Sequence, residues 1–497
     1  MGYALGETMN CTTSVTDKVE VGGDPCTQDL RGQIRDLFDQ FSVPGGAVVM
    51  VAGGRAAVVS HGRVSLSRPG PVTGDTLFSV GSVAKTVVSS ALAALVADGR
   101  VAWDDLLVSH VPEFGFPDPA AREQVSLRDC VANRLGLARE GFCEWGASDS
   151  LPITELLGRL VHTPLDRPLR SGFSYVNPGH SAAALVVARV SGLSFMEFVQ
   201  QRLLEPAGLT GVAAGTGAQD CANRTDCHVF RANDVAVRAE PFFADNAIGG
   251  TGVWMTPQSI LGWLRLHLGH GSIGGRRLIP AAVHQQLCIP HVTVPEDEWP
   301  FGVGPMECSE VGYGLGWFSA CYRGRRMLHH SGAEVGANAH LSIAPNDDVA
   351  VGVVANAATP AADVIGLTLL DSLLGLPPLP WTRRAEGKHP QAHSSRRPLN
   401  LRRGSNPGAE LHDYAGRYHH AGNGPAHITV RGPLLEIRFP DAPRFDGHLR
   451  PLGGPWFAPK PTDIALRSVL AEPAEFALEN GRASSFSLPG FGTWLRA

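Results

Sequence analysis

Two side chains that could react together, Ser82 and Lys85, stand three residues apart in the stretch Phe78-Ser-Val-Gly-Ser-Val-Ala-Lys85. The apolar run that follows, residues 86–96, predicts a buried helix with Ser82 at its start, and this spacing places both side chains on one helical face. A desolvated lysine can lose its proton near neutral pH, and a helix N-terminus favours an alkoxide. The pair therefore has the composition of an activated serine nucleophile.

The structural alternative is a serine that caps the helix, followed by a lysine whose amine reaches solvent. The use of lysine in this chain weighs against it. Among 42 Lys and Arg, the only lysines are Lys18, Lys85, Lys388 and Lys460. Arginine keeps its proton in proteins, so a lysine in the least hydrated of these four settings indicates a base.

The elements that would hold this pair come from both ends of a discontinuous domain. Residues 45–52 and 56–60 are two apolar runs separated by Gly53-Gly-Arg and predict a β-hairpin. Strands return at 312–318, 326–330, 339–343 and 349–354, and a helix follows at about 361–374. Helices and loops dominate the residues between these two groups. We therefore predict an α/β (α+β) catalytic domain over 29–375, made of 29–99 and 256–375 with a helical insertion at 100–255.

The flanking segments differ from this domain in composition. Residues 1–28 are polar and non-periodic, which predicts a flexible extension. Residues 376–411 are rich in Pro, Arg, His and Ser and predict a linker. Residues 412–497 contain alternating runs at 427–430, 434–439 and 476–488, with an Asn480-Gly481 turn. This last segment predicts a small antiparallel β-domain.

Global composition excludes several function classes. The 497 residues suggest two or three domains, and a net charge of −5 gives no case for a nucleic-acid or anionic-membrane partner. The N-terminus lacks the features of a secretory signal, and no apolar run reaches the length of a membrane span, so we expect a soluble, cytoplasmic protein. The nine scattered cysteines suit free thiols. We expect no metal and no cofactor, because zinc spacings and a P-loop are missing.

Two further motifs carry groups that could serve the same site. Tyr175-Val-Asn177 precedes an apolar helical run, and an extended backbone would point both polar side chains the same way. Asn177 could instead only cap that helix, and Tyr175 could only pack. His330-Ser331-Gly332 lies at the end of a predicted strand, where His330 or His329 could equally be a structural histidine.

Three motifs, taken in chain order, resemble those of the penicillin-recognising serine enzymes. They are Ser82-Val-Ala-Lys85, Tyr175-Val-Asn177 and His330-Ser331-Gly332. The resembling branch contains class C β-lactamases, serine esterases, D-amino-acid peptidases and acyltransferases. It spans residues 30–375, including Tyr313-Gly-Leu-Gly-Trp317. The resemblance implies the serine β-lactamase/DD-peptidase fold, an antiparallel sheet flanked by helices with an all-helical insertion. Residues 412–497 resemble the lipocalin-like β-barrel domain that some members append.

The resemblance also implies roles for individual residues. Ser82 would be the nucleophile that forms an acyl-enzyme, while Lys85 and Tyr175 would share general-base and proton-relay work. That role requires nearby positive charge to lower the pKa of the phenol. Asn177 would position Lys85 and the substrate, and His330 would assist proton transfer or orient the substrate. The oxyanion hole would be formed by the backbone N–H groups of Ser82 and Ala333, with Ser331 and Gly332 beside the substrate.

Two departures from the family pattern bear on specificity. The third motif begins with His330 where β-lactamases carry a lysine, which removes a fixed cation for a substrate carboxylate. We therefore expect poor turnover of β-lactams. Where relatives usually carry His-Thr-Ser-Gly-Leu, this chain has Asn133-Arg-Leu-Gly-Leu137, so we expect one wall of the pocket to differ.

The function predicted from these residues is acyl transfer from an ester or amide of a small molecule or short peptide. The acceptor is water in a hydrolase, or an amine or alcohol in a transacylase, and the two share every catalytic residue. A D-amino-acid peptidase or amidase is the alternative within the same class. A non-catalytic ligand-binding protein that kept the fold is the alternative of another class. The identity of the acyl donor and acceptor, the oligomeric state and the role of the C-terminal domain stay open.

Overall fold

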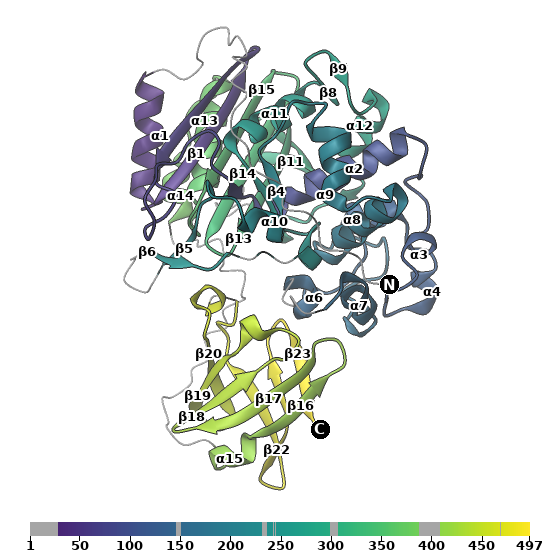
Figure 1. Ribbon diagram of the computed structural model, residues 1–497, viewed down its shortest axis with the longest axis vertical. Coiled ribbons are helices and arrows are strands. Elements are labelled where there is room, and N and C mark those ends of the chain that lie inside the picture. Colours follow the sequence, from purple (N-terminus) through teal and green to yellow (C-terminus); the bar gives the residue numbers. More distant parts are fainter. Residues whose placement is uncertain are drawn as a thin grey trace.

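An eight-stranded antiparallel sheet forms the centre of the catalytic part of the chain (Figure 1). The computed structural model describes residues 28–145, 151–230, 236–241, 243, 245–298, 307–386, 408–467 and 469–497. The sheet order is β10-β11-β12-β13-β14-β15-β1-β2, so the first two strands of the chain join the last ones. The strands are β1 (Gly45–Ala52), β2 (Arg55–Gly62), β10 (Val292–Thr293), β11 (Cys308–Tyr313), β12 (Phe318–Tyr322), β13 (Arg325–Glu334), β14 (Ala337–Ala344) and β15 (Val349–Ala355).

The hairpin expected from Gly53-Gly54 is present, with Ala52 paired to Arg55 across it. Both glycines have positive φ, as the tight turn of a two-residue hairpin requires. The single strand predicted at 312–318 is wrong, because β11 ends at Tyr313 and β12 begins at Phe318. A turn joins them, closed by the hydrogen bond from Gly314 N to Trp317 O (2.7 Å).

Helices cover both faces of the sheet (Figure 1). Helices α1 (Gln28–Gln40) and α13 (Ala361–Leu373) pack on one face, where Phe38 and Met50 share a core with the helix residues. Helix α11 (Pro257–Leu268) packs on the other face. Trp263 of α11 donates a hydrogen bond to Thr86 Oγ1 (3.0 Å) and so fixes α2 (Ala84–Ala97) beside the sheet.

The residues between α2 and α11 are mainly short helices. They are α3 (Leu107–His110), α4 (Pro119–Arg122), α5 (Leu127–Val131), α6 (Gly141–Trp145), α7 (Ile153–Gly158), α8 (Pro178–Ser191), α9 (Phe195–Val199) and α10 (Thr216–Gln219). A small sheet, β3 (Phe78–Ser79), β7 (Val253–Met255) and β4 (Val212–Ala214), joins the two ends of this region. The remaining pieces are β5 (Cys227–Phe230), β6 (Ala236–Ala239), β8 (Ser272–Ile273), β9 (Arg276–Arg277) and α12 (Ala281–Cys288).

A closed antiparallel barrel of eight strands follows, as predicted for the C-terminal part (Figure 1). Its strands are β16 (Gly416–His420), β17 (Gly424–Arg431), β18 (Leu434–Arg438), β19 (Gly447–Gly453), β20 (Trp456–Pro461), β21 (Ala474–Glu479), β22 (Arg482–Leu488) and β23 (Gly492–Arg496). A helical turn, α15 (Leu411–Tyr414), precedes it. Large side chains such as Tyr418, Phe476 and Trp494 fill the interior.

The segment predicted as a linker contains α14 (Trp381–Ala385). Trp381 is buried and donates a hydrogen bond to Asp371 Oδ2 of α13 (2.9 Å), which anchors this part of the segment to the catalytic part. The rest of the predicted linker at 387–407, and the predicted extension except Gln28, lie outside the described residues.

None of the helices in the described part of the chain combines, alone, the length and apolar character of a membrane span. One pair of helical segments, Pro178–Ser191 and Phe195–Leu204, with a bend between them, meets these criteria of length and composition together.

Candidate active site

Ser82 and Lys85 lie at the junction of β3 and α2, where a 3₁₀ turn (Gly81–Val83, η1) leads into the helix. Lys85 Nζ lies 3.2 Å from Ser82 Oγ. The side chain of Lys85 is fully buried, so its amine does not reach solvent. Neither helical segment has a capping hydrogen bond from a side chain at its N-terminus. The geometry therefore excludes the alternative in which Ser82 only caps the helix and the Lys85 amine reaches solvent.

The Lys85 amine has three oxygen neighbours. Besides Ser82 it donates to Asn177 Oδ1 (2.6 Å) and to the backbone oxygen of Gly250 (2.7 Å). Burial lowers the pKa of Lys85 to about 7, with Arg139 acting in the same direction and the carboxylates of Glu144 and Glu334 opposing it. A neutral amine has two N–H donors and one lone pair. With both donors engaged, the lone pair is directed to the Ser82 hydroxyl.

Asn177 is fixed by contacts on both ends of its amide. It is the residue before the first turn of α8, but its side chain makes no capping hydrogen bond. Its Nδ2 donates to the backbone oxygen of Glu144 (2.8 Å), and its backbone N–H donates to Glu144 Oε2 (2.7 Å). The capping alternative for Asn177 is thus excluded, since its amide spans from Glu144 to Lys85.

Tyr175 lies against the same amine, with Lys85 Nζ 4.7 Å from its ring centroid. Burial raises the pKa of the phenol to about 12, although a hydrogen bond with Ser82 and the nearby Arg139 guanidinium oppose the shift. This direction is opposite to the expected lowering, because desolvation outweighs the cationic neighbours. At neutral pH the hydroxyl of Tyr175 therefore carries its proton.

The segment at 133–137, whose sequence differs from the usual family pattern, makes hydrogen bonds to the backbone around Tyr175. The backbone oxygen of Asn133 accepts from Ser174 N (2.8 Å), and its Oδ1 accepts from Val176 N (3.3 Å). Ser174 Oγ donates to Leu137 O (2.7 Å). Asn133 is fully buried and has a positive φ of 53°, which asparagine tolerates better than most residues.

His330 is buried on β13 and engaged through both ring nitrogens. Its Nδ1 lies 2.7 Å from the carbonyl oxygen of Ser331, which assigns the proton to Nδ1. Its Nε2 then accepts from the hydroxyl of Tyr313 (3.2 Å). Burial, followed by the charge of Lys85, lowers the pKa of His330 to about 3. A neutral imidazole held in this way is better suited to orienting the substrate than to acting as a general acid.

The backbone of β13 touches the turn that bears Ser82. A Cβ added to Gly332 would lie 1.9 Å from Val80 O and 3.1 Å from Ser82 N. A Cβ added to Gly81 would lie 2.9 Å from the backbone nitrogen of Ala333. Only glycine allows this approach, so the backbone of Gly332 and Ala333 lies against that of Gly81 and Ser82. The predicted oxyanion donors are therefore neighbours.

Three groups of this site were missed by the sequence analysis: Glu144, Arg139 and the backbone oxygen of Gly250. Glu144 is buried and accepts from Arg139 Nε (2.9 Å). Burial raises the pKa of Glu144, while Arg139, Asn177 N–H and Lys85 oppose the shift. Arg139 also lies 5.4 Å from the ring centroid of Tyr175. No motif marks these residues, and α6, which carries Glu144, has only five residues and is too short to show a helical repeat in the sequence.

A second serine cluster lies between β14 and α13. Ser342 Oγ is 2.6 Å from His340 Nε2, and His340 Nδ1 is 2.9 Å from Asp363 Oδ1. His329 Nδ1 is 3.2 Å from Ser342 Oγ. All four residues are buried. His329, His340 and Asp363 also have ligand atoms within 4.8 Å of one another, but the nitrogens of His340 are already engaged by Asp363 and Ser342.

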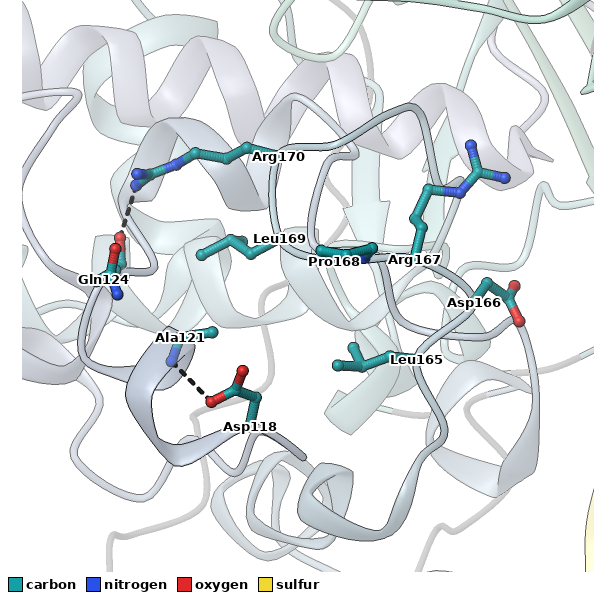
Figure 2. Close-up of a pocket in the computed structure, with 9 residues that line it drawn as sticks. All are labelled: Asp118, Ala121, Gln124, Leu165, Asp166, Arg167, Pro168, Leu169 and Arg170. Atoms are coloured by element: carbon teal, nitrogen blue, oxygen red, sulfur yellow. Dashed lines mark hydrogen bonds between the residues drawn. The ribbon is translucent and has the colours of Figure 1, made fainter.

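An open pocket of about 490 Å³ lies elsewhere, between α4 and the loop at 165–170 (Figure 2). Arg170 lies along one side of it and donates to the backbone oxygen of Gln124, while Asp118 caps the first turn of α4. None of the predicted catalytic residues lines this pocket.

Comparison with known proteins is consistent with this geometry. The family model described as Beta-lactamase matches residues 30–375. The unguisins hydrolase ungD′ of Aspergillus campestris is 22% identical over 72% of this chain and 66% of its own length. Penicillin-binding protein 4 of Amycolatopsis lactamdurans is 23% identical over 64% of this chain and 82% of its own length. A D-aminopeptidase of Gluconobacter oxydans is 26% identical over 70% of this chain and 62% of its own length.

Solved structures share the fold over both parts of the chain. The octameric penicillin-binding protein homologue from Pyrococcus abyssi superposes with a TM-score of 0.60 at 17% identity, covering 93% of this chain and 95% of its own. SurE superposes with a TM-score of 0.57 at 19% identity, covering 94% of this chain and 98% of its own.

Proposed function

The chain belongs to the β-lactamase family of serine hydrolases and peptidases, and on this premise we propose that Ser82 forms an acyl-enzyme with an ester or amide of a small molecule or short peptide. The single observation that carries the proposal is the arrangement of Lys85, whose two donors are taken by Asn177 and Gly250 and whose remaining position faces Ser82 Oγ.

In this mechanism the neutral amine of Lys85 takes the proton of Ser82 as its oxygen attacks the acyl carbon. The developing oxyanion accepts hydrogen bonds from the N–H groups of Ser82 and Ala333, a type of donor pair that stabilises such charge by several kcal/mol. Tyr175, protonated at neutral pH, then gives its proton to the leaving group. His330 holds Tyr313 at the edge of the site.

Deacylation follows the same relay in reverse: an acceptor hydroxyl or amine attacks the acyl carbon in place of the departed leaving group and gives its proton to the Tyr175 phenolate, and the protonated Lys85 returns its proton to Ser82 Oγ as that oxygen is released. Water as the acceptor gives a hydrolase, and an amine or alcohol gives a transacylase. The similarity to a D-aminopeptidase supports short peptides as acyl donors, and the similarity to this peptidase and to an unguisins hydrolase supports water as the acceptor. His330 in place of a lysine supports a substrate without the carboxylate of a β-lactam.

The test is to follow p-nitrophenyl acetate with and without glycinamide, for wild type and Ser82→Ala, and to identify the acetylated products by mass spectrometry. We expect release of p-nitrophenolate by wild type, with acetate as the main product. N-acetylglycinamide above the level made by Ser82→Ala would show that amines compete as acceptors. Equal release by both proteins would overturn the proposal.

A D-amino-acid peptidase is the second candidate, favoured by the D-aminopeptidase relative. It predicts faster cleavage of D-alanine p-nitroanilide than of the L enantiomer by wild type. Cleavage of neither anilide, with p-nitrophenyl acetate turned over, would exclude this candidate.

A further inference from the structure

One end of the C-terminal barrel lies against the catalytic part of the chain, near α6 and α7 (Figure 1). The turns β16–β17, β18–β19, β20–β21 and β22–β23 share this end, because successive connections alternate between the ends of an up-and-down barrel. Each of these turns contacts the catalytic part, through Asn423, Asp441, Ile464 and Gly490 respectively.

Phe142 of α6 enters the barrel at this end. Its ring centroid lies 5.4 Å from that of Phe439, 5.1 Å from Phe445 and 5.6 Å from Phe491. Its backbone N–H donates to Asn423 Oδ1 (2.8 Å), and Gly141 N donates to Gly490 O (3.0 Å). Only 3% of Phe142 is exposed. A residue of the catalytic part is therefore part of the barrel core.

The barrel interior is packed with side chains and is not hollow. A cavity among Ile437, Phe445 and Leu488 has a volume of about 10 Å³, enough for a single water. The rings of Phe457, Phe476 and Phe486 contact one another in sequence. Such an interior supports a structural role and leaves little room for a small-molecule ligand.

The other side of α6 faces the proposed nucleophile. Two residues after Phe142, Glu144 accepts from the backbone N–H of Asn177, and the backbone oxygen of Glu144 accepts from the Asn177 side chain. Asn177 in turn accepts from Lys85. A short helix thus connects the barrel core to the amine beside Ser82 through hydrogen bonds and one aromatic side chain.

We propose that the barrel is a positioning element of the active site: it holds α6 through Phe142, and α6 holds Asn177 against Lys85 through Glu144. The inference rests on the proposed function of Ser82 and Lys85. Phe142 and Glu144 act through Asn177 and are positioning residues, not catalytic ones. The ion pair of Arg159 with Asp441 (2.7 Å) is a barrel contact outside α6, made by the helical turn that follows α7.

The pH dependence of acylation distinguishes positioning from simple loss of stability. Charged and titratable groups around Lys85 are Glu144 of α6, Arg139 before it, Glu334 and His330 of β13, Tyr175 before α8 and His180 within α8. Glu144 raises the pKa of Lys85. Glu144→Gln removes that charge, so the amine stays neutral to lower pH and the acidic limb of the acylation profile moves to lower pH.

Phe142→Leu introduces no charge, so we expect it to move this limb through the displacement of Glu144. We expect Phe142→Leu to slow acylation by p-nitrophenyl acetate about 10- to 100-fold, as misplaced catalytic groups do, and to shift the limb in the same direction as Glu144→Gln. The double variant should be no slower than the slower single variant, because both changes act through one contact.

The matched control is Phe457→Leu, the same truncation of a buried barrel ring that contacts Tyr414 and Phe476. Asp441→Asn controls for a barrel contact away from α6. Both should acylate close to the wild-type rate with an unmoved limb. Wild-type acylation by Phe142→Leu, or an equal loss in Phe457→Leu, would overturn the inference.

Hydrogen exchange of peptides that span residues 174–181 separates this inference from the proposed function, since it needs no turnover. Exchange should rise in Phe142→Leu and stay unchanged in Phe457→Leu. Unchanged exchange in Phe142→Leu would overturn the positioning role. If wild type released no p-nitrophenolate, the proposed function would fail while the exchange result still decided the inference.

Discussion

Among the described residues, the hydrogen-bonded cluster around Ser82 and the one around Ser342 differ in their surroundings. Ser342, His340 and Asp363 have the residue types and hydrogen-bond order of a hydrolase triad. They lie fully buried between β14 and α13. Ser82 is partly exposed and lies beside the backbone nitrogens of a strand end.

The comparison shows that residue types and distances alone do not make a nucleophile. An acyl donor must be able to reach the serine, and hydrogen-bond donors must already point to the position where the oxyanion forms. The Ser342 cluster has good hydrogen-bond geometry but no access, so its polar groups satisfy one another inside the core. In the Ser82 cluster the buried Lys85 amine lies 3.2 Å from a serine that is partly exposed and lies beside the backbone of β13.

The largest effect is expected for Lys85→Arg. Arginine stays protonated, so the base is lost although a positive charge remains near Ser82. Acylation by p-nitrophenyl acetate should fall by about 10²- to 10⁴-fold, the usual contribution of general-base catalysis. Stopped-flow release of p-nitrophenolate measures it. A variant within a few-fold of wild type would remove Lys85 as the base.

The pH profile should follow the neutral form of Lys85. Because burial lowers the pKa of the amine to about 7, the fraction of neutral amine falls about tenfold for each pH unit below that value. Acylation should therefore rise from pH 5 and level off above pH 7. A flat rate between pH 5 and 8 would contradict the assignment.

Tyr175→Phe should slow reactions according to their leaving groups. Tyr175 is a protonated phenol near Ser82, so its loss should cost about 10²-fold with an alkyl amide and much less with p-nitrophenyl acetate, whose leaving group needs no proton. Rates for the two donors measure this ratio. Equal losses with both would exclude Tyr175 as the proton donor.

The smallest effect on rate is expected for Ser342→Ala. This change leaves the Nε2 of buried His340 without its partner and should lower the free energy of unfolding by about 1–3 kcal/mol. Acylation of Ser82 should be unchanged. Chemical denaturation measures the stability, and the matched Ser342→Cys separates loss of volume from loss of the hydrogen bond. A large loss of acylation at unchanged stability would mean that the cluster has a chemical role.

Local chemistry made part of this site predictable. The spacing of Ser82 and Lys85 on an apolar helix is set within one turn, so sequence alone places them together. The order of the three motifs indicated Asn177 and His330. The Gly53-Gly54 and Asn480-Gly481 turns fixed two hairpins of the fold, since their backbone requirements are local.

The remaining features depend on contacts between distant segments. Glu144 of α6 contacts Asn177, which lies 33 residues further along the chain, while Phe142 of the same helix lies in the barrel core. The direction of the Tyr175 pKa shift depends on a balance between burial and nearby charge, and no sequence motif indicates that balance. The strand predicted at 312–318 was wrong because its glycines close a turn whose partners are set by tertiary packing.

The measurement that tests the central claim most directly is the intact mass of wild type, Ser82→Ala and Ser342→Ala after brief exposure to p-nitrophenyl acetate and an acid quench. The account predicts one acetyl adduct on wild type and on Ser342→Ala, and none on Ser82→Ala. An adduct that persists in Ser82→Ala and disappears in Ser342→Ala would contradict it.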